Sequence, residues 1–505
     1  MKNKEYYAGD MSDPLEQIRQ QLSKLEKKML SATEKRSLLL KNIHPQQWHA
    51  AQNLIHYLTL RNEDIRQLQD SLHIHGISSL TSSESHIHSQ LQSILQILGK
   101  VYSPDELNAC NYKFSRNQIR QKCKILFGEQ NDNDSPYIMV TFDSTFAENY
   151  TLIKALLQNG MNVARINCAH DKEATWLKMV HQLKKACRFT GLNCKIYMDL
   201  AGPKIRTKLT KKGSKKGKVK VSEGDLVWLA DDANGFNDDD IVISPTERGI
   251  ISMVKKGESI FIDDGIIKGV VEAIKKDRAA IRIVRISSGK QLIKADKGIN
   301  FPDSEISIAS LTDFDKACFP FICEHADIIG NSFVRNHFDL ACLQEALKKI
   351  SSHPPNIIIK IETPDAVKNL PDLLLQGMKQ NAFGVMIARG DLAVEIGFER
   401  MGEIQEEILW ICEAAHVPVV WATQVLETLN KSGMATRSEI TDAAHAAMAE
   451  CVMINKGDHI IEVLVTLRDI LHRISGHHIK KRFTFRPLSI ASRFMNEQPS
   501  TNSIN

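Results

Sequence analysis

The spacing of hydrophobic residues divides the chain into a helical first part and a later part of alternating strands and helices. In the first part, apolar residues recur every three or four positions, which is typical of helices with one buried face. The clearest runs are Leu15, Ile18, Leu22, Leu25 and Met29; Trp48, Ala51, Leu54, Ile55 and Leu58; and Ile87, Leu91, Ile94 and Leu98. The pattern predicts a helical extension over residues 1–135. We expect this extension either to cap the rest of the protein or to bind a partner or a second copy of the chain.

From about residue 136, short apolar runs of strand length appear, each followed by helix-like sequence. Continuous apolar runs are typical of strands buried on both faces. The eight runs are 137–140, 162–166, 194–198, 327–330, 356–361, 384–388, 417–422 and 451–454. Eight strand-then-helix units favour a closed parallel barrel over an open doubly wound sheet. We therefore predict an α/β fold, a (β/α)8 TIM barrel formed by residues 136–207 and 298–476.

The gap between the third and fourth predicted strands is much longer than one barrel helix requires. Its middle contains β-rich runs at 218–221, 226–229, 259–262, 266–271 and 280–284. Asp263-Asp264-Gly265 is a tight-turn signal between two of them. This predicts a small all-β lid domain at residues 208–297, inserted at the mouth of the barrel. The polar Ser- and Asn-rich tail, residues 477–505, is predicted to be disordered.

Composition narrows the class of protein. A formal charge of +5 over 505 residues is too small to indicate a nucleic-acid partner. No apolar run approaches the roughly 20 residues of a membrane helix, and the polar first thirty residues do not resemble a signal peptide. The ten cysteines are scattered, which is typical of reduced thiols. We expect a cytoplasmic protein that binds neither nucleic acid nor membrane.

Polar and charged residues follow almost every predicted barrel strand at its carboxyl end, where barrel enzymes hold their catalytic residues. One such residue is ordinarily the exit of a strand to solvent, but six strand ends converging on one ring predict an active site. The residues are Arg165, Asn167 and His170; Asp199, Lys204 and Arg206; Ser332; Lys360 and Glu362; Gly390 and Asp391; and Thr423.

The residue types at these ends predict a metal-assisted reaction on an anionic substrate. Glu362 and Asp391 end adjacent strands, so their carboxylates can share one Mg²⁺ or Mn²⁺ ion. Lys360 lies two residues from Glu362 and therefore points to the same side of the strand. Together with Arg165 and Arg206, it suits a phosphorylated substrate. Gly390 allows close approach of the backbone to a ligand, and the helix that follows it can bind an anion.

Several motifs resemble those of the pyruvate kinase family, in that family's order over about residues 137–457. They are 160–170 (GMNVARINCAH), 199–207 (DLAGPKIRT), 261–265 (FIDDG), 297–302 (KGINFP), 359–362 (IKIE), 386–392 (MIARGDL), 422–427 (ATQVLE) and 436–439 (TRSE). The resemblance implies a phosphotransferase that makes pyruvate and ATP from phosphoenolpyruvate and ADP. The β-rich insert lies where that family carries its lid.

The resemblance also implies roles for individual positions. Glu362 and Asp391 would hold the divalent metal, and Lys360 would neutralise the phosphoryl group and the developing enolate. Thr423 would lie near the enolate carbon. The other implied roles are contacts to phosphoenolpyruvate by Arg165, Ser332 and the Gly390 amide, contact to the transferring phosphoryl group by Arg206, and a place toward the nucleotide for Asn167 and His170.

Three positions depart from the family's monovalent-cation site. Asn167 and Asp199 match that site, but Ala169 stands where the family usually has Ser, and Leu200 where it usually has Thr. Lys204 replaces an acidic residue that is usual in potassium-dependent members. Because a lysine ammonium can supply the missing positive charge, we predict activity without K⁺.

Other departures keep alternative functions open. Asn455-Lys-Gly-Asp458 and Thr141-Phe-Asp-Ser144 differ from the usual family motifs near the nucleotide. We also expect the family's C-terminal regulatory domain to be missing. One alternative is a lyase or aldolase-like enzyme that uses a pyruvate enolate. Another is a non-catalytic binding protein on the same fold.

Overall fold

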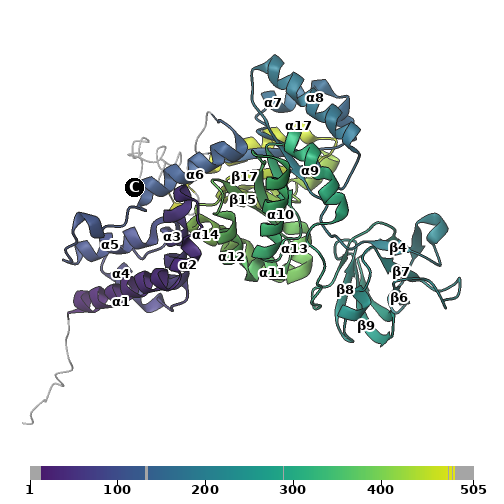
Figure 1. Ribbon diagram of the computed structural model, residues 1–505, viewed down its shortest axis with the longest axis horizontal. Coiled ribbons are helices and arrows are strands. Elements are labelled where there is room, and N and C mark those ends of the chain that lie inside the picture. Colours follow the sequence, from purple (N-terminus) through teal and green to yellow (C-terminus); the bar gives the residue numbers. More distant parts are fainter. Residues whose placement is uncertain are drawn as a thin grey trace, which may run out of the picture.

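The computed structural model describes residues 13–130, 135–287, 289, 291–475, 477–479 and 482–483. A central barrel separates a group of N-terminal helices on one side from a β-rich domain on the other (Figure 1). Of the predicted tail at 477–505, the structure describes a short pair of strands, β18 (His478–Ile479) and β19 (Arg482–Phe483). The rest of the tail lies outside the described residues.

Eight parallel strands form the closed barrel, in the order β1-β17-β16-β15-β14-β13-β3-β2. Their bounds are β1 (Tyr137–Phe142), β2 (Val163–Asn167), β3 (Lys195–Asp199), β13 (Ile328–Asn331), β14 (Asn356–Ile361), β15 (Phe383–Ala388), β16 (Val419–Ala422) and β17 (Cys451–Ile454). Almost every residue of these strands is buried, which accounts for their mostly apolar sequence. The predicted barrel fold, with its β-rich insertion and helical extension, is confirmed.

Helices that follow the strands cover the outside of the barrel. They are α7 (Tyr150–Gln158), α8 (Glu173–Thr190), α9 (Asp313–His325), α10 (His337–Ile350), α11 (Pro364–Lys368), α12 (Leu370–Gly377), α13 (Arg389–Ile396), α14 (Met401–Ala414), α15 (Glu427–Ser432), α16 (Arg437–His445) and α17 (Ile460–Ser475). This arrangement brings the carboxyl ends of all eight strands to one mouth.

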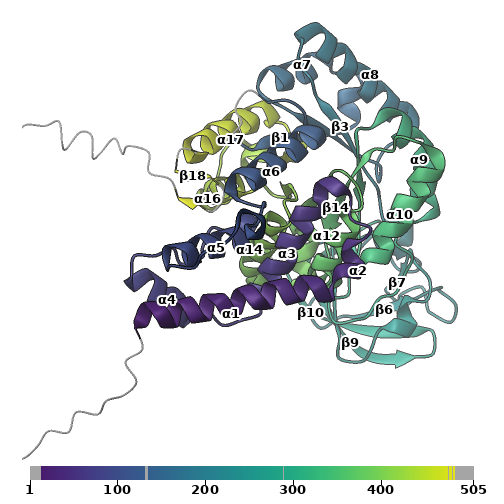
Figure 2. The ribbon, with the colours of Figure 1, turned by 60° about the vertical axis from the view of Figure 1, so that its left-hand side comes forward.

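The N-terminal helices form a second packed unit against the barrel (Figure 2). They are α1 (Pro14–Lys35), α2 (Ser37–Leu40), α3 (Trp48–Arg61), α4 (Arg66–Ile74), α5 (Ile87–Ile97) and α6 (Tyr112–Phe127). The side chain of Asp13 caps α1 by accepting a hydrogen bond from the Leu15 N–H. The predicted face of α1 is buried at Ile18, Leu22 and Met29, as the helical spacing requires.

Side chains of this unit hold it to the barrel by bonding to backbone carbonyls. The Asn53 amide donates to the Ala414 carbonyl (2.8 Å) at the end of α14. The Lys122 ammonium donates to the carbonyl of His416 (2.7 Å). Lys122 is almost fully buried, and burial lowers its pKa to about 7. These contacts explain why polar residues interrupt otherwise apolar helix faces.

Helix α6 closes the amino-terminal end of the barrel. Leu126 and Phe127 pack into one hydrophobic cluster with residues that fill the barrel interior, among them Met139, Ile358 and Met386. Each of these five side chains is at most 1% exposed. The base of the barrel is therefore plugged by the helical extension, while the mouth at the other end is free for chemistry.

The inserted domain contains a seven-stranded sheet in the order β12-β8-β9-β10-β6-β7-β4 and a two-stranded sheet of β11 and β5. The strands are β4 (Thr207–Leu209), β5 (Lys218–Lys220), β6 (Leu226–Ala230), β7 (Val242–Pro245), β8 (Ser259–Ile262), β9 (Ile267–Lys275), β10 (Arg278–Ile286), β11 (Leu292–Lys294) and β12 (Ile299–Asn300). The predicted turn at Asp263-Asp264-Gly265 joins β8 to β9, with all three residues at positive φ.

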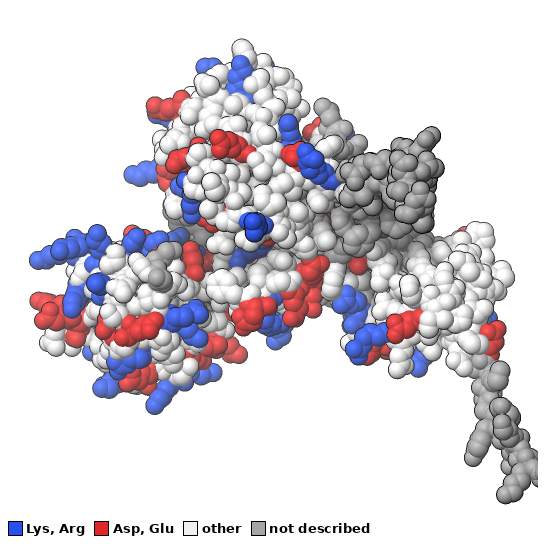
Figure 3. Space-filling view, turned by 180° about the vertical axis from the view of Figure 1, so that it is seen from behind, with Lys and Arg blue, Asp and Glu red and all other residues white. Residues whose placement is uncertain are grey.

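Charged side chains of both signs are mixed on the face of the molecule seen from behind (Figure 3). On the face drawn in Figure 3, basic and acidic side chains are interspersed, including those over the inserted domain. Among the residues that the structure describes, no helix is long and apolar enough to cross a membrane. All ten cysteines lie in the described part of the chain, and none of them forms a disulfide there.

We expect Leu126→Ala to lower the free energy of unfolding by about 3 kcal/mol, because it leaves a cavity at the plugged base of the barrel. Ile125→Ala is the matched control, since Ile125 lies on the same helix but is 37% exposed. Urea unfolding followed by circular dichroism measures both variants. Equal losses in the two variants would contradict a plug formed by α6.

Candidate active site

Asp199 is the buried centre of the barrel mouth. Its carboxylate, at the end of β3, accepts hydrogen bonds from Arg165 (Nε 3.1 Å, Nη2 2.6 Å) and from the Tyr197 hydroxyl (3.1 Å). The Lys360 ammonium lies 3.2 Å from the same carboxylate. Burial alone would raise the pKa of Asp199, but Lys360 and Arg165 outweigh it and leave that pKa below its ordinary value. Asp199 is therefore a permanent anion that fixes two cations.

Gly330 on β13 makes this packing possible. A Cβ atom at this position would lie 2.1 Å from the Tyr197 hydroxyl and 2.3 Å from a carboxylate oxygen of Asp199. Any larger residue would push both groups out of place. The glycine next to the strand end is thus a steric requirement of the buried ion pairs.

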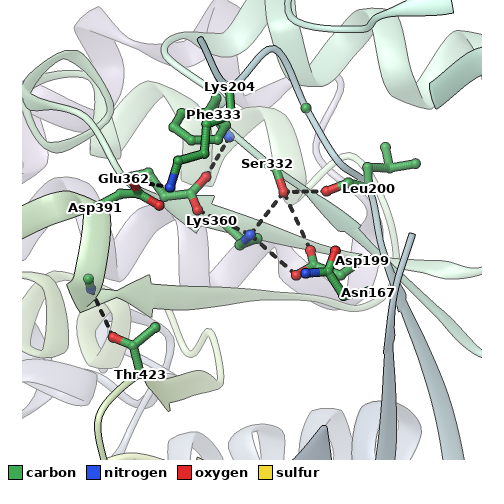
Figure 4. Close-up of polar contacts among 12 residues, drawn as sticks. Asn167, Asp199, Leu200, Lys204, Ser332, Phe333, Lys360, Glu362, Asp391 and Thr423 are labelled. Carbon is green, nitrogen blue, oxygen red and sulfur yellow. Dashed lines mark hydrogen bonds and ion pairs between the residues drawn. The ribbon is translucent and has the colours of Figure 1, made fainter. Parts of the chain in front are cut away.

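Lys360 joins Asp199 to the carboxylate of Glu362. Its ammonium lies 3.1 Å from Glu362 Oε1 and donates to the Ser332 hydroxyl (2.9 Å). Burial lowers the pKa of a lysine, but Asp199 and Glu362 outweigh that effect and raise it. The Phe333 N–H also donates to Glu362 Oε2 (2.6 Å). Lys360 is thus held as a cation at the floor of the mouth (Figure 4).

A second lysine, Lys204, holds the other predicted metal ligand. Its ammonium lies 2.7 Å from Asp391 Oδ1 and 3.7 Å from Asp264 Oδ1 on the β8–β9 turn of the inserted domain. In Figure 4 the ammonium points to the carboxylate of Asp391, to which a dashed line joins it. Burial alone would lower the pKa of Lys204, but Asp391 and Asp264 outweigh it and raise that pKa.

The donor set at Glu362 and Asp391 fits a hard divalent cation. Asp391 already pairs with a positive group, the Lys204 ammonium, and Glu362 pairs with another, the Lys360 ammonium. Burial, together with the nearby charge of Asp391, raises the pKa of Glu362, so a further cation would be stabilised here. Within the described residues no group of three or more His, Cys, Asp or Glu side chains forms a metal site. Two carboxylates completed by water and substrate oxygens are the arrangement that Mg²⁺ favours.

Thr423 is fixed at the end of β16 by the start of α13. Its hydroxyl accepts a hydrogen bond from the Gly390 N–H (2.8 Å). Arg389 donates to the carbonyls of Ala422 (2.9 Å) and Thr423 (2.6 Å), and it forms an ion pair with Asp442. Thr423 has a φ of +64°, which is uncommon outside glycine. The clamp by Arg389 holds this backbone conformation.

The predicted residues surround one cavity of about 280 Å³ at the mouth. Those lining it are Arg165, Asn167, His170, Lys204, Arg206, Lys360, Glu362, Asp391 and Thr423. Of the other predicted residues, Asp199 and Ser332 lie beneath it, bonded to Lys360, and Gly390 lies behind Thr423. A neighbouring cavity of about 360 Å³ shares Arg165, Asn167 and His170 with it. The two cavities provide adjoining places for two ligands.

The ion-pair partner of Lys204 in the structure differs from the neighbours predicted for it. Lys204 was expected beside Asn167 and Asp199 as a replacement for a monovalent cation, but its ammonium lies at Asp391 instead. The reason is the turn after β3. Gly202 has a φ of +65°, and Lys204 passes so close to Gly298 that a Cβ atom there would lie 2.7 Å from Lys204 Cε. The chain is thereby directed away from Asp199 and toward α13.

Sequence reasoning missed several residues that support the site. Asp264 was identified only as a turn residue, yet its carboxylate faces Lys204. Arg389 was seen next to Gly390, but its distant partner Asp442 could not be inferred from spacing. Glu395, on the last turn of α13, also went unnoticed. It accepts a hydrogen bond from Asn300 (2.8 Å) and lines a third cavity, of about 210 Å³, between the mouth and the inserted domain.

Fold and site together define a (β/α)8-barrel protein with paired carboxylates and a cationic pocket at its mouth. A sequence model of the pyruvate kinase barrel domain matches residues 137–459. The chain therefore belongs to the pyruvate kinase family, as its motifs predicted.

Individual relatives agree with this membership. Pyruvate kinase of Staphylococcus saprophyticus is 30% identical over 332 residues, which are 64% of this chain and 54% of that protein. Pyruvate kinase of Geobacillus stearothermophilus is 31% identical over 335 residues, 65% of this chain and 55% of that protein. The cytosolic isozyme of Nicotiana tabacum is 32% identical over 310 residues, 60% of this chain and 58% of that protein. The chain thus spans little more than half the length of these relatives.

Glu395 provides a test of the electrostatics beside the mouth. Burial raises the pKa of its carboxyl to about 7 from an ordinary value of 4.5. The folded state then binds more protons than the unfolded state between these values, so its stability falls as the pH rises from 4.5 to 7. We expect Glu395→Gln to remove this pH dependence. Relative to the wild type, its free energy of unfolding should rise by about 2 kcal/mol between pH 4.5 and 7, and the difference should stay constant above pH 7.

Urea unfolding at several pH values measures this difference. Glu399→Gln, a change at an exposed position on the following turn, serves as the control. A gap between Glu395→Gln and the wild type that does not vary with pH would contradict the assignment.

Proposed function

We propose that this protein is an active pyruvate kinase, transferring a phosphoryl group from phosphoenolpyruvate to ADP to give pyruvate and ATP. The observation that carries the proposal is the convergence of Arg165, Lys360, Glu362, Asp391 and Thr423 on one cavity. The barrel-domain match supports it. The activity of the relatives named above is extended to this chain as a proposal, since their proteins are longer.

Phosphoenolpyruvate would lie on the floor of the mouth. Arg165 and Lys360, both held by Asp199, present two fixed positive charges to its phosphate. As the phosphoryl group leaves, negative charge grows on the enolate oxygen, and the Lys360 ammonium is placed to stabilise it. Ser332 accepts a hydrogen bond from Lys360 and would orient it, and Thr423 would lie near the enolate carbon, where a proton is delivered. Arg206, at the outer wall, would contact the transferring group.

Glu362 and Asp391 would hold Mg²⁺ or Mn²⁺. When bound, the ion supplies charge neutralisation and orientation to the phosphate oxygens. ADP would occupy the neighbouring cavity beside Asn167 and His170. Burial and the nearby cations Lys456 and Arg206 lower the pKa of His170, so it would meet the nucleotide as a neutral imidazole. Closure of the inserted domain over the mouth would exclude water and protect the phosphoryl group from hydrolysis.

The proposed function assigns a role to each domain of the chain. Residues 136–207 and 298–476 would be the catalytic barrel, residues 208–297 the lid, and residues 1–135 a helical extension for packing, a partner or a second copy. We propose action in the cytoplasm, which the unpaired cysteines of the described chain support.

We expect the purified protein to form pyruvate from phosphoenolpyruvate and ADP when Mg²⁺ is present, as followed by coupling to lactate dehydrogenase. Lys360→Met should lower kcat by about a thousandfold or more, because it removes a cation aimed at the developing charge. Lys379→Met is the control, since Lys379 lies on the exposed surface. Absence of turnover with any nucleoside diphosphate would reject the proposal. Condensation of pyruvate with an aldehyde would instead favour the lyase.

We also propose that the enzyme needs no K⁺. The positions of the family's monovalent-cation site offer few oxygen ligands: Ala169 has no side-chain oxygen, and the Asn167 side-chain oxygen already accepts the Ala169 N–H (3.0 Å). Arg165 and Lys360 already balance the charge of Asp199. Rates in K⁺ and in tetramethylammonium salts of equal ionic strength should agree within about twofold, a small difference on the free-energy scale. Activation by K⁺ of tenfold or more would overturn the idea.

A further inference from the structure

Lys204 occupies one of the two carboxylates that would receive a divalent cation, that of Asp391. Its ammonium is 2.7 Å from Asp391 Oδ1, which is the distance of a charge-assisted hydrogen bond. The side chains of Lys204 and Asp391 are only 19% and 17% exposed, so water screens the pair weakly. Glu362 adds to the attraction, since its charge also contributes to raising the pKa of Lys204.

An ammonium and a divalent cation compete for the same carboxylate oxygen of Asp391. Mg²⁺ binds carboxylate oxygens at about 2.1 Å and keeps its remaining positions for oxygen ligands, so a lysine nitrogen in the same space would be repelled. For the metal to bind, the Lys204 ammonium has to leave Asp391.

The structure offers Lys204 a second anion nearby. Asp264 Oδ1 lies 3.7 Å from the ammonium, on the turn between β8 and β9 of the inserted domain. The stem of Lys204 runs beside Gly298, where a side chain would clash with it, so the glycine is what allows Lys204 to pass between the two anions. The turn itself is held by an ion pair between Asp263 and Lys297 (2.9 Å). A small rotation of Lys204 would therefore exchange a partner on the barrel for one on the inserted domain.

We propose that Lys204 is an internal competitor for the divalent cation, and that metal binding transfers it from Asp391 to Asp264. The inference rests on the metal-dependent function proposed above and adds a regulation to that site. Loading the metal thereby strengthens an ion pair between the barrel mouth and the inserted domain. Metal occupancy and closure of that domain become linked through one side chain.

Mn²⁺ binding to the full chain tests the proposal without substrate or turnover. The signal of free Mn²⁺ in electron paramagnetic resonance gives the dissociation constant. Lys204→Met removes the competitor and should tighten Mn²⁺ binding about tenfold, as expected for loss of a charged hydrogen bond to the ligand. Lys204→Arg keeps the charge and should bind Mn²⁺ no more tightly than the wild type, because a guanidinium also pairs with Asp391. Lys379→Met, which removes the same charge at an exposed position away from the mouth, should change binding by about twofold or less.

The exchange of partners is tested by a double-mutant cycle. Asp264→Asn should weaken Mn²⁺ binding about threefold in the wild type, because Lys204 loses its second partner, and should have no effect in Lys204→Met. An equal effect in both backgrounds would show general electrostatics and overturn the transfer. Unchanged or weaker Mn²⁺ binding in Lys204→Met would overturn the competition.

Misfolding of a variant and failure of the proposed function can each be told apart from failure of this inference. Far-ultraviolet circular dichroism checks each variant, and Lys204→Gln replaces Lys204→Met if the latter does not fold. If the wild type forms no pyruvate but Lys204→Met still binds Mn²⁺ more tightly, the proposed function fails and this inference stands. If the wild type is active and binding is not tightened, the inference fails alone. Absence of Mn²⁺ binding in every variant overturns the inference as well.

Discussion

The buried carboxylate of Asp199 is the interaction on which the barrel mouth depends. A charged group this far from water is stable only when it is paired and hydrogen-bonded, and here Arg165, Lys360 and Tyr197 all point to it. Removing one partner would leave another charge uncompensated in the interior. The geometry of the cations that face the cavity therefore follows from the need to satisfy one anion beneath them.

Most of the fold could be predicted because its signals are local. Each barrel strand is mostly apolar, since it is buried on both faces, and each helix that follows has one apolar stripe. The inserted domain was found because its β-rich sequence interrupts that alternation. The assignment of α6 as the plug of the barrel could not be made, because the partners of Leu126 and Phe127 come from strands across the whole later chain.

The sequence predicted which residues belong to the site, but only some of the contacts between them. Position at a strand end and period-two spacing were enough to group Lys360 with Glu362 and to expect Asp391 nearby. Strand position and spacing could not predict which carboxylate would form an ion pair with Lys204. That choice depends on the direction of the chain after Gly202 and on the space beside Gly298, which are properties of packing. The same limit hid Asp264 and Asp442, whose partners lie far away in sequence.

The positive φ angles in the turn after β16 limit which substitutions can stabilise this protein without disturbing Thr423. Thr423, Gln424 and Leu426 all have positive φ, at +64°, +57° and +50°, and each such residue costs about 1 kcal/mol or more relative to an unstrained one. Replacing Gln424 by glycine would relieve part of that cost while loosening the segment that aims the Thr423 hydroxyl. A substitution that raises the stability of this turn would therefore loosen the orientation of the Thr423 hydroxyl. Variants selected only for heat resistance would be drawn toward glycine here, away from the residues that hold Thr423 in place.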